Sequence, residues 1–438
     1  MNKKNILICI HNPFALVNLI PTLEEISNSY HITIMTSNYL LENKQILKKT
    51  LEIKKNLNIK NLLILPFYYS NSDQRNIFSI IKSHLYLLKI KNILKQESFK
   101  LCISDGSFFL WQKIILNEFV NKNCLKIGIT HDSLNLHLDK LDEFLAGKDI
   151  NKILDEVHKL RQIKKLNNGI KSKKFFSKIK NSIIRFNDKY IDRILIPLIF
   201  YKKKFLYMKN DFKTAFDTNS FKYVINFFYS SYLFWGKYYG ENNVFLVSPK
   251  TNCKCNNLNK KNKILFISSI LWSKNNESLD FQTDYFFKFL EKKVANYESS
   301  YEIDFRHHPM QLEEDAKYIN EHLIKKNKKN FRINFKNNFD SISSISCNYK
   351  IIFGCISSAL YFAKHGCNNV ELYCLKSISK NELGEKYYLK LYNEDIKMFD
   401  DINNSFESFQ DLPSKNYKSL KQILDKIENL HKQEKSNE

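Results

Sequence analysis

A histidine pair followed by proline is the first feature of the sequence that suggests chemistry. Apolar and polar residues alternate from 301 to 306, which predicts a β-strand, and His307, His308 and Pro309 follow it. Proline restricts the residue before it to extended backbone conformations. An imidazole held there can bond a phosphate oxygen or protonate a leaving phosphate, so His308 is a candidate catalytic and phosphate-binding residue. Pro309 belongs to the same predicted site, His307 is a reserve candidate, and the alternative for His308 is a structural histidine in a loop.

Two serines form the second feature. The apolar run 351–353 predicts a strand, Gly354 a turn, and Ser357 and Ser358 the start of a helix. A helix N-terminus offers free backbone N–H groups and the positive end of a dipole, which suits a phosphate. The alternative is an N-cap without a ligand. We favour phosphate binding, because Gly354 permits close approach and two hydroxyls cluster there.

An aspartate in the N-terminal half is the best-placed candidate for a general base. The strand predicted from residue 100 stops at Asp105, and a glycine follows. The alternative is an aspartate that only caps a turn. His131 and Asp132 form a nearby reserve pair, and His11 is a further reserve histidine.

Two sheets are needed to position these residues. Strand-like apolar runs alternate with helix-like segments in both halves, which predicts βαβ units, parallel sheets and an α/β fold with two Rossmann-like domains. Five candidates each fall just beyond the carboxyl end of a predicted strand, where two such domains would face a central cleft. These candidates are Asp105, His131, Ser268, His308 and Ser357. Ser268 is therefore included among the phosphate-binding candidates.

The expected boundaries follow changes in composition. We expect an N-terminal acceptor domain at 1–245, a C-terminal nucleotide-binding domain at 260–412, and a C-terminal helix and tail at 413–438, with a linker at 244–262. A lysine-rich helical insertion is predicted at about 141–240. Within it, 171–213 alternates apolar residues with lysines, as an amphipathic helix on an anionic membrane does; the alternative is a solvated insertion packed on the core.

Charge and composition narrow the function classes. The formal net charge of +24 predicts an acidic partner, although the same lysine-rich and asparagine-rich composition also arises from A/T-rich coding sequence. No nucleic-acid-binding module is recognisable, so nucleic acid is not the expected partner. Neither dinucleotide-binding nor P-loop glycine patterns occur, and no D-x-D motif suggests a metal that bridges a diphosphate. We therefore expect no metal and no cofactor.

Nine scattered cysteines, several inside apolar runs, are typical of buried reduced thiols. The start of the chain predicts a strand and not a signal peptide, and no apolar run is long enough for a membrane span. These features favour a cytoplasmic protein that binds at most peripherally to the inner membrane.

The motifs resemble those of bacterial sialyltransferases and polysialyltransferases with the GT-B fold. Members of that family carry an acidic pair before glycine, then an HP pair, then a serine pair. Here 104–106, His308-Pro309 and 357–358 stand in that order. Ser104 departs from the pattern, since the family usually carries an acid at that position.

The resemblance implies a metal-independent, inverting glycosyltransferase. It would move a nonulosonic acid such as sialic acid from a CMP-activated donor to a hydroxyl of a surface glycan, in lipooligosaccharide or capsule. By similarity Asp105 would deprotonate the acceptor hydroxyl, His308 would bind and protonate the departing CMP phosphate, and Ser357 and Ser358 would hold it. The alternatives are a CDP-glycerol-type polymer glycerophosphotransferase with a second essential histidine, His11 or His131, and a non-catalytic basic nucleic-acid-binding protein.

Overall fold

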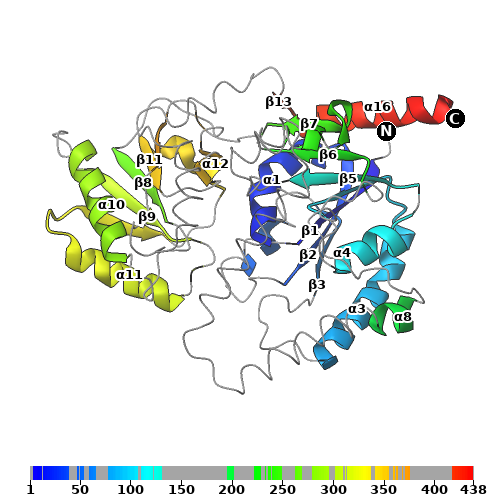
Figure 1. Cartoon of the computed structure of the whole chain (residues 1–438), viewed down its shortest axis with the longest axis horizontal. Helices are drawn as coiled ribbons and strands as arrows, with labels where there is room; N and C mark the ends of the chain where they lie inside the picture. The colour runs from blue at the N-terminus through cyan, green and yellow to red at the C-terminus, as the bar shows by residue number, and fades with distance from the viewer. Residues whose placement is uncertain are drawn as a thin grey trace.

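The structure is a computed structural model of the full chain, and two separate parallel sheets dominate it (Figure 1). It describes residues 3–11, 13–38, 47–48, 50–53, 59–65, 77–106, 110–121, 123–130, 195–201, 221–227, 232, 235–237, 239–248, 262–268, 279–294, 301–308, 311, 313–336, 341–354, 359–360, 362–363, 367, 370–374 and 417–437. The statements that follow concern these residues.

The first sheet has eight strands, and every neighbouring pair in it is parallel. Its spatial order is β13-β7-β6-β5-β4-β1-β2-β3. The strands are β1 (Lys4–Ile10), β2 (Tyr30–Ser37), β3 (Asn61–Leu65), β4 (Leu101–Ser104), β5 (Leu125–Thr130), β6 (Tyr223–Asn226), β7 (Val244–Val247) and β13 (Tyr417–Lys418). The order reverses between β1 and β4, which makes that point the topological switch of a Rossmann-like sheet.

The second sheet has five parallel strands in the order β10-β9-β8-β11-β12. These are β8 (Lys263–Ile267), β9 (Glu302–Arg306), β10 (Arg332–Lys336), β11 (Ile351–Gly354) and β12 (Glu371–Cys374). Its switch point lies between β8 and β11. The strand orders and directions of both sheets confirm the predicted fold: α/β, GT-B-like, with two Rossmann-like parallel sheets.

Helices connect the strands, as parallel pairing requires. In the N-terminal half they are α1 (Pro13–Ser27), α3 (Ile77–Gln96), α4 (Leu110–Ile114) with a π-helical continuation at Ile115–Phe119, α8 (Ile196–Tyr201) and a 3-10 turn at Glu241–Asn243. In the C-terminal half they are α10 (Leu279–Val294), α11 (Glu313–Lys326), α12 (Ile342–Ile345), a 3-10 turn at Ser346–Asn348 and α16 (Leu420–Asn437). No described helix is long and apolar enough to span a bilayer.

Strand β1 is buried on both faces, which explains its unbroken apolar sequence. Ile6, Ile8 and Ile10 lie in one core cluster with residues of α1 and α16, whereas Leu7 and Cys9 lie in a second with residues of α3 and α4. This alternation is the two-residue period of a strand. Helices therefore cover both faces of the first sheet.

Aromatic rings fill one side of the second sheet. Phe266 on β8 lies 4.9 Å, centroid to centroid, from each of Phe286, Phe305 and Phe353. Phe289 on α10 stacks on Phe353 at 4.2 Å. The rings join β8, β9 and β11 to α10, and so fix the strand ends that carry the candidate site.

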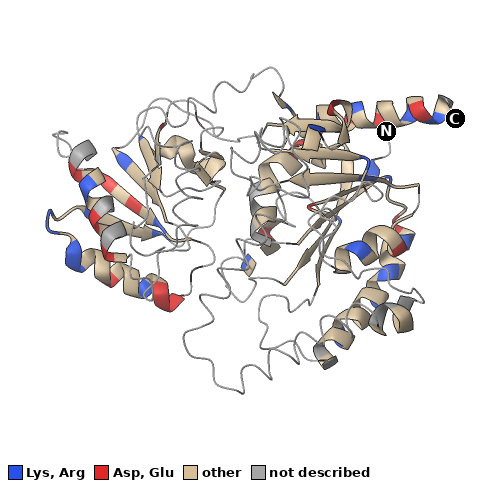
Figure 2. Ribbon diagram, in the orientation of Figure 1, with Lys and Arg blue, Asp and Glu red and all other residues tan. Residues whose placement is uncertain are grey.

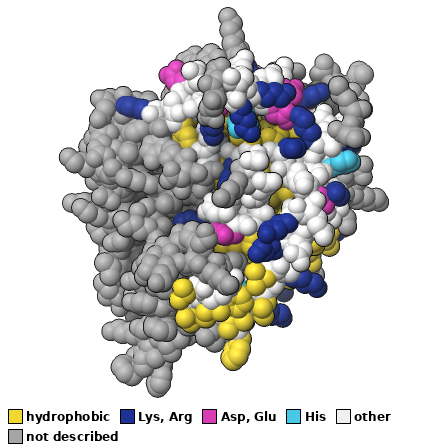
Figure 3. Space-filling model, turned by 90° about the vertical axis from the view of Figure 1, so that its right-hand side faces the viewer, with side chains coloured by type: hydrophobic (Ala, Val, Ile, Leu, Met, Phe, Trp, Pro, Cys, Tyr) yellow, Lys and Arg dark blue, Asp and Glu magenta, His cyan; other side chains and the backbone are white. Residues whose placement is uncertain are grey.

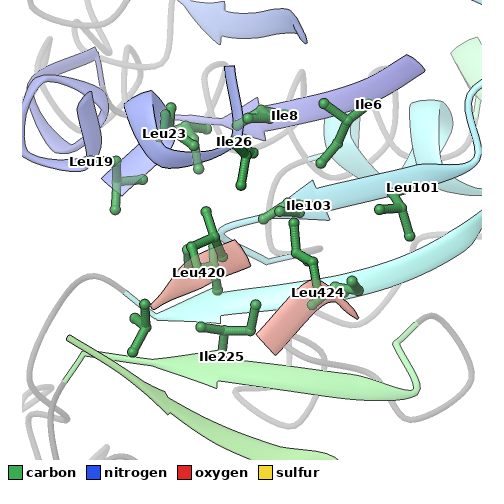
Figure 4. Close-up of a cluster of buried hydrophobic side chains, with 14 of the residues drawn as sticks. Ile6, Ile8, Leu19, Leu23, Ile26, Leu101, Ile103, Ile225, Leu420 and Leu424 are labelled. Carbon is green, nitrogen blue, oxygen red and sulfur yellow. The ribbon is translucent and has the colours of Figure 1, made fainter. Parts of the chain in front are cut away.

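Helix α16 returns the end of the chain to the first sheet. Leu420, Ile423, Leu424 and Ile427 are fully buried in the core cluster that α1 forms with one face of the first sheet (Figure 4). Their spacing of three and four residues places them on one side of the helix. Glu428 adds polar contacts at the edge, because its carboxylate accepts a hydrogen bond from the Tyr30 hydroxyl at 3.0 Å.

Three short strands differ from the expectations. Strand β6 lies inside the segment expected to be helical, β7 inside the expected linker, and β13 just before the C-terminal helix. The helical and linker expectations are therefore wrong at those residues. Strand β6 lies in a lysine-rich segment, β7 leads into a polar stretch and β13 has only two residues, so none of them was recognised as a strand. The domain boundaries themselves stay a prediction, and nearly all of 141–220 lies outside the described residues.

The cysteine expectation is confirmed in part. Cys9, Cys102, Cys124 and Cys367 are free and buried. Cys347 is disulfide-bonded, so the expectation of reduced thiols is wrong for that residue.

We predict that Leu424→Ala lowers the free energy of unfolding by about 2 to 5 kcal/mol, because it leaves a cavity between α16 and the sheet. Urea denaturation measures this. Gln433→Ala, on the exposed side of the same helix, is the matched control and should change stability by less than about 0.5 kcal/mol. Equal effects of the two substitutions would show that α16 does not depend on this packing.

Candidate functional site

Asp105 and His11 meet at the switch point of the first sheet. Asp105 directly follows β4 and His11 directly follows β1, and these strands are neighbours. The backbone N–H of His11 donates to Asp105 Oδ2 at 3.0 Å, and the backbone N–H of Asp105 donates to the Cys9 carbonyl at 3.1 Å. The carboxylate is therefore tied to the ends of both strands.

Gln112 holds the other carboxylate oxygen. Its side-chain amide donates to Asp105 Oδ1 and lies 3.4 Å from the Ser104 hydroxyl. Ser104 Oγ in turn donates to the Gly106 carbonyl at 2.7 Å, and Gly106 has a φ of 143°, which favours glycine. The Ser104 side chain therefore stabilises the turn after β4. Donors on both oxygens orient Asp105, as a general base requires.

The His11 ring is fixed by Trp111. The indole N–H of Trp111 donates to His11 Nδ1 at 3.2 Å. An indole nitrogen can only donate, so Nδ1 must carry a lone pair and the neutral ring carries its proton on Nε2. Trp111 is fully buried and His11 is buried. Sequence reasoning missed Trp111 and Gln112, although side-chain N–H donors in the first turn of the helix that follows a strand-end aspartate are a usable signal.

The second sheet presents Ser268 and Arg306 at its carboxyl edge. Ser268 follows β8, Arg306 ends the neighbouring β9, and the Ser268 backbone N–H donates to the Arg306 carbonyl at 3.0 Å. Ser268 is buried, and its hydroxyl has no hydrogen-bond partner within the described part of the chain. Buried hydroxyl groups usually have a hydrogen-bond partner, so the Ser268 hydroxyl is suited to form a hydrogen bond with a ligand.

Arg306 is the most important residue that sequence reasoning missed. It is 4% exposed, which is rare for an arginine. Its charge also acts on His308. Burial, and then the Arg306 guanidinium, lower the pKa of His308 from 6.5 to about 4. An incoming phosphate would be attracted by Arg306 and would raise the pKa of His308 again.

His307 is oriented differently from its neighbour. It is buried, with Nδ1 3.1 Å from Gln311 Oε1 and Nε2 2.8 Å from Asn320 Oδ1. Burial lowers its pKa, so the ring is neutral near pH 7 and one of the two amides presents its NH2 group to it. Both ring nitrogens are engaged within the protein, and a ligand contact from His307 would require one of these bonds to break.

Gly354 allows the closest approach of backbone in the site. A Cβ atom at this position would lie 2.4 Å from the carbonyl oxygen of Ile267, so only glycine fits beside the end of β8. The switch point of the second sheet therefore depends on this residue. Ser357 and Ser358 follow it in the chain but lie outside the described residues, as do Pro309, His131 and Asp132.

The carboxyl edges of the two sheets contact each other through two phenylalanines. Phe227 directly follows β6 of the first sheet, and Phe362 belongs to the segment after β11 of the second. Their ring centroids are 6.0 Å apart in an edge-to-face arrangement, and Phe362 is part of the core cluster of the first sheet. The candidate residues thus occupy two edges that are joined. A shared cleft between them stays a prediction.

The chain is similar to several solved structures. No protein-family model matches the sequence, and the comparison with curated proteins finds no match. Among solved structures, TcCGT1 in complex with UDP has 8% identity and a TM-score of 0.49, with 100% of both chains covered. The GT-B domain of a sialyltransferase from Photobacterium damselae has 10% identity and a TM-score of 0.46, over 92% of this chain and 98% of that one.

A third solved structure is the wall teichoic acid polymerase TagF, with 11% identity and a TM-score of 0.44, over 99% of this chain and 90% of that one. These proteins differ in their names and substrates, and likeness of this degree carries no information on activity. Function must therefore be argued from the site. Among the described residues, no three His, Cys, Asp or Glu side chains lie together as a metal site would require.

We predict that His308 makes the protein less stable in acid. The unfolded histidine takes up a proton near pH 6.5, whereas the folded one resists protonation down to about pH 4. Stability is therefore full above pH 6.5 and falls as the pH decreases toward 4, by about 2 to 3 kcal/mol from this residue. Urea denaturation at a series of pH values measures the loss.

In His308→Asn the free energy of unfolding should decrease less as the pH falls. The decrease that remains should come from His307 and His322, whose pKa values burial also lowers. His31→Asn, at an exposed position at the opposite end of β2, is the control and should keep the wild-type pH dependence. The same dependence of stability on pH in His308→Asn as in the wild type would contradict a neutral, half-buried His308.

Proposed function

We propose that the protein is a glycosyltransferase that moves a nonulosonic acid from a CMP-activated donor to a hydroxyl of a cell-surface glycan. One observation supports this proposal: the carboxyl edges of the two sheets carry different and complementary kinds of residue. An oriented carboxylate, Asp105, lies at one edge, and a cationic, hydroxyl-bearing cluster of Ser268, Arg306 and His308 lies at the other. The Phe227–Phe362 contact joins these edges.

The first edge supplies the base. Asp105 would accept the proton of the acceptor hydroxyl, whose oxygen then attacks the anomeric carbon of the donor and inverts it. The His11 N–H and the Gln112 amide keep the carboxylate in one orientation, which limits the reorganisation that proton transfer requires. His11 carries its proton on Nε2, so that its ring can act as a hydrogen-bond donor at this edge.

The second edge supplies the leaving-group site. As the bond between the anomeric carbon and the phosphate oxygen breaks, the electron pair and negative charge move to CMP. Arg306 would offset that charge, the Ser268 hydroxyl would donate to a phosphate oxygen, and Ser357 and Ser358 would complete the site. His308 is neutral before the donor binds; the phosphodiester monoanion of the donor, and the second charge that develops as CMP leaves, raise its pKa, so it can be protonated and can pass the proton to the departing CMP.

A single monophosphate suits this set of residues. Its charge can be balanced by one guanidinium, one imidazole and hydroxyl or backbone donors, so the proposed reaction uses neither metal nor cofactor. The partners we propose are therefore a nucleotide-sugar donor and a glycan or glycolipid acceptor. A location in the cytoplasm, peripheral to the inner membrane, would bring both within reach.

The test is CMP release from CMP-sialic acid in the presence of a glycan acceptor, with CDP-glycerol as the competing donor. We expect turnover of CMP-sialic acid only, and a loss of about 100- to 10,000-fold in kcat in both Asp105→Asn and His308→Ala. These residues lie at strand ends and contribute little to the core, so the variants should fold.

Two matched controls, His31→Ala and Asp280→Asn, remove the same residue types from exposed positions away from both carboxyl edges and should keep wild-type turnover. Release of CMP from CDP-glycerol alone would replace the proposal with glycerophosphate transfer. Wild-type turnover in either site variant would remove that residue from the mechanism.

A further inference from the structure

The surface formed by α3 and α8 is unusually apolar for a protein with a large net charge. Six large apolar side chains on these helices and at the residue before α8 are exposed, and we refer to them as the α3–α8 patch: Phe78, Leu85, Ile93, Leu195, Leu198 and Ile199. Phe78 is 79% exposed and Ile199 is 60% exposed. Figure 3 shows hydrophobic side chains gathered together on this side of the molecule. Scattered single apolar residues need no explanation, but a group of this kind indicates a binding surface.

Both helices are anchored by their inner faces. Leu87, Ile90 and Leu94 of α3 are buried in the core of the first sheet. Phe200 of α8 packs near Ile80, and its ring lies 6.3 Å from that of His84, which is fully buried. The helices therefore cannot turn to hide the patch, and the exposed side chains on their outer faces are free to meet a partner.

Lysines alternate with the apolar residues on the outer face of α3. Phe78, Lys82, Leu85 and Lys89 follow one another at intervals of four, three and four residues, so they share one side of the helix, and both lysines are exposed. Neither α3 nor α8 contains an acidic residue (Figure 2). The surface thus combines apolar side chains with positive charge alone.

We infer that the α3–α8 patch docks the protein onto a membrane surface that contains anionic lipids. Apolar side chains on such a helix enter the boundary between headgroups and acyl chains, while the long lysine side chains reach back to the phosphates. A protein partner fits less well, because lysine is depleted from the centres of protein interfaces. The proposal does not depend on the chemistry at the carboxyl edges.

The geometry favours a helix that lies on the membrane and does not cross it. Helix α3 has 20 residues, which corresponds to a length of about 30 Å along the surface. Its buried inner face keeps it parallel to the sheet. The segment 171–213 was expected to contact a membrane, and α8 lies within it. Helix α3 lies outside that segment and contributes a second, longer membrane-binding surface.

The test is sedimentation of the full chain with phosphatidylcholine vesicles, with and without phosphatidylglycerol. We expect binding that requires phosphatidylglycerol and weakens with salt. The variant Phe78→Ser/Leu85→Ser/Ile199→Ser should lower the partition coefficient by about tenfold or more, since three apolar side chains no longer leave water. Lys82→Glu/Lys89→Glu should lower it by a similar factor, because attraction becomes repulsion.

The matched control is Ile324→Ser/Lys325→Glu on α11, which changes a 65% exposed isoleucine and an exposed lysine elsewhere on the molecule and should bind as the wild type does. Circular dichroism checks that every variant folds. Wild-type sedimentation of both patch variants, or an equal loss in the control, would overturn the proposal. So would a patch variant that changes only the oligomeric mass in analytical ultracentrifugation, because a second copy of the chain would then cover the patch.

Discussion

The parallel direction of every strand is the constraint on which the rest of the structure depends. In a parallel sheet all carboxyl ends lie at the same edge, so residues that follow different strands are gathered there whatever their separation in the sequence. His11 and Asp105 meet for this reason at β1 and β4, and Ser268 and Arg306 meet at β8 and β9. The helices that parallel connections require also bury both faces of each sheet, which holds these edges rigidly in place.

The two edges carry complementary chemistry. The first fixes a carboxylate between a backbone N–H and an amide, and fixes a histidine tautomer with an indole. The second buries a guanidinium beside a histidine whose pKa is low, and leaves a serine hydroxyl without a partner in the described residues. One edge therefore suits proton abstraction, and the other suits a developing phosphate charge. The contact of Phe227 with Phe362 connects them, and Gly354 is the residue that permits close packing at the second edge.

Sequence reasoning found the strands with continuous apolar or alternating patterns, and through them the positions of Asp105, Ser268 and His308. It missed β6, β7 and β13, because β6 lies in a lysine-rich segment, β7 leads into a polar stretch and β13 has only two residues; their pairing with neighbouring strands identifies them. It missed Arg306 because an arginine at the end of an alternating strand resembles an exposed residue until burial is known. It missed Gln112 and Trp111 because their role depends on how α4 is placed beside β1 and β4. The apolar side of α3 was also not apparent, since a helix that is apolar on two faces resembles a core helix.

The central claim is that the edge of the second sheet binds the nucleotide while the edge of the first sheet acts on the acceptor. Calorimetric titration of CMP into wild type, Ser268→Ala and Asp105→Asn tests it most directly. Because the Ser268 hydroxyl has no hydrogen-bond partner among the residues that the structure describes, its removal should leave folding intact and weaken CMP binding by about five- to tenfold. Asp105→Asn should bind CMP as the wild type does. Failure of CMP to bind the wild type, or a loss of affinity in Asp105→Asn but not in Ser268→Ala, would contradict the claim.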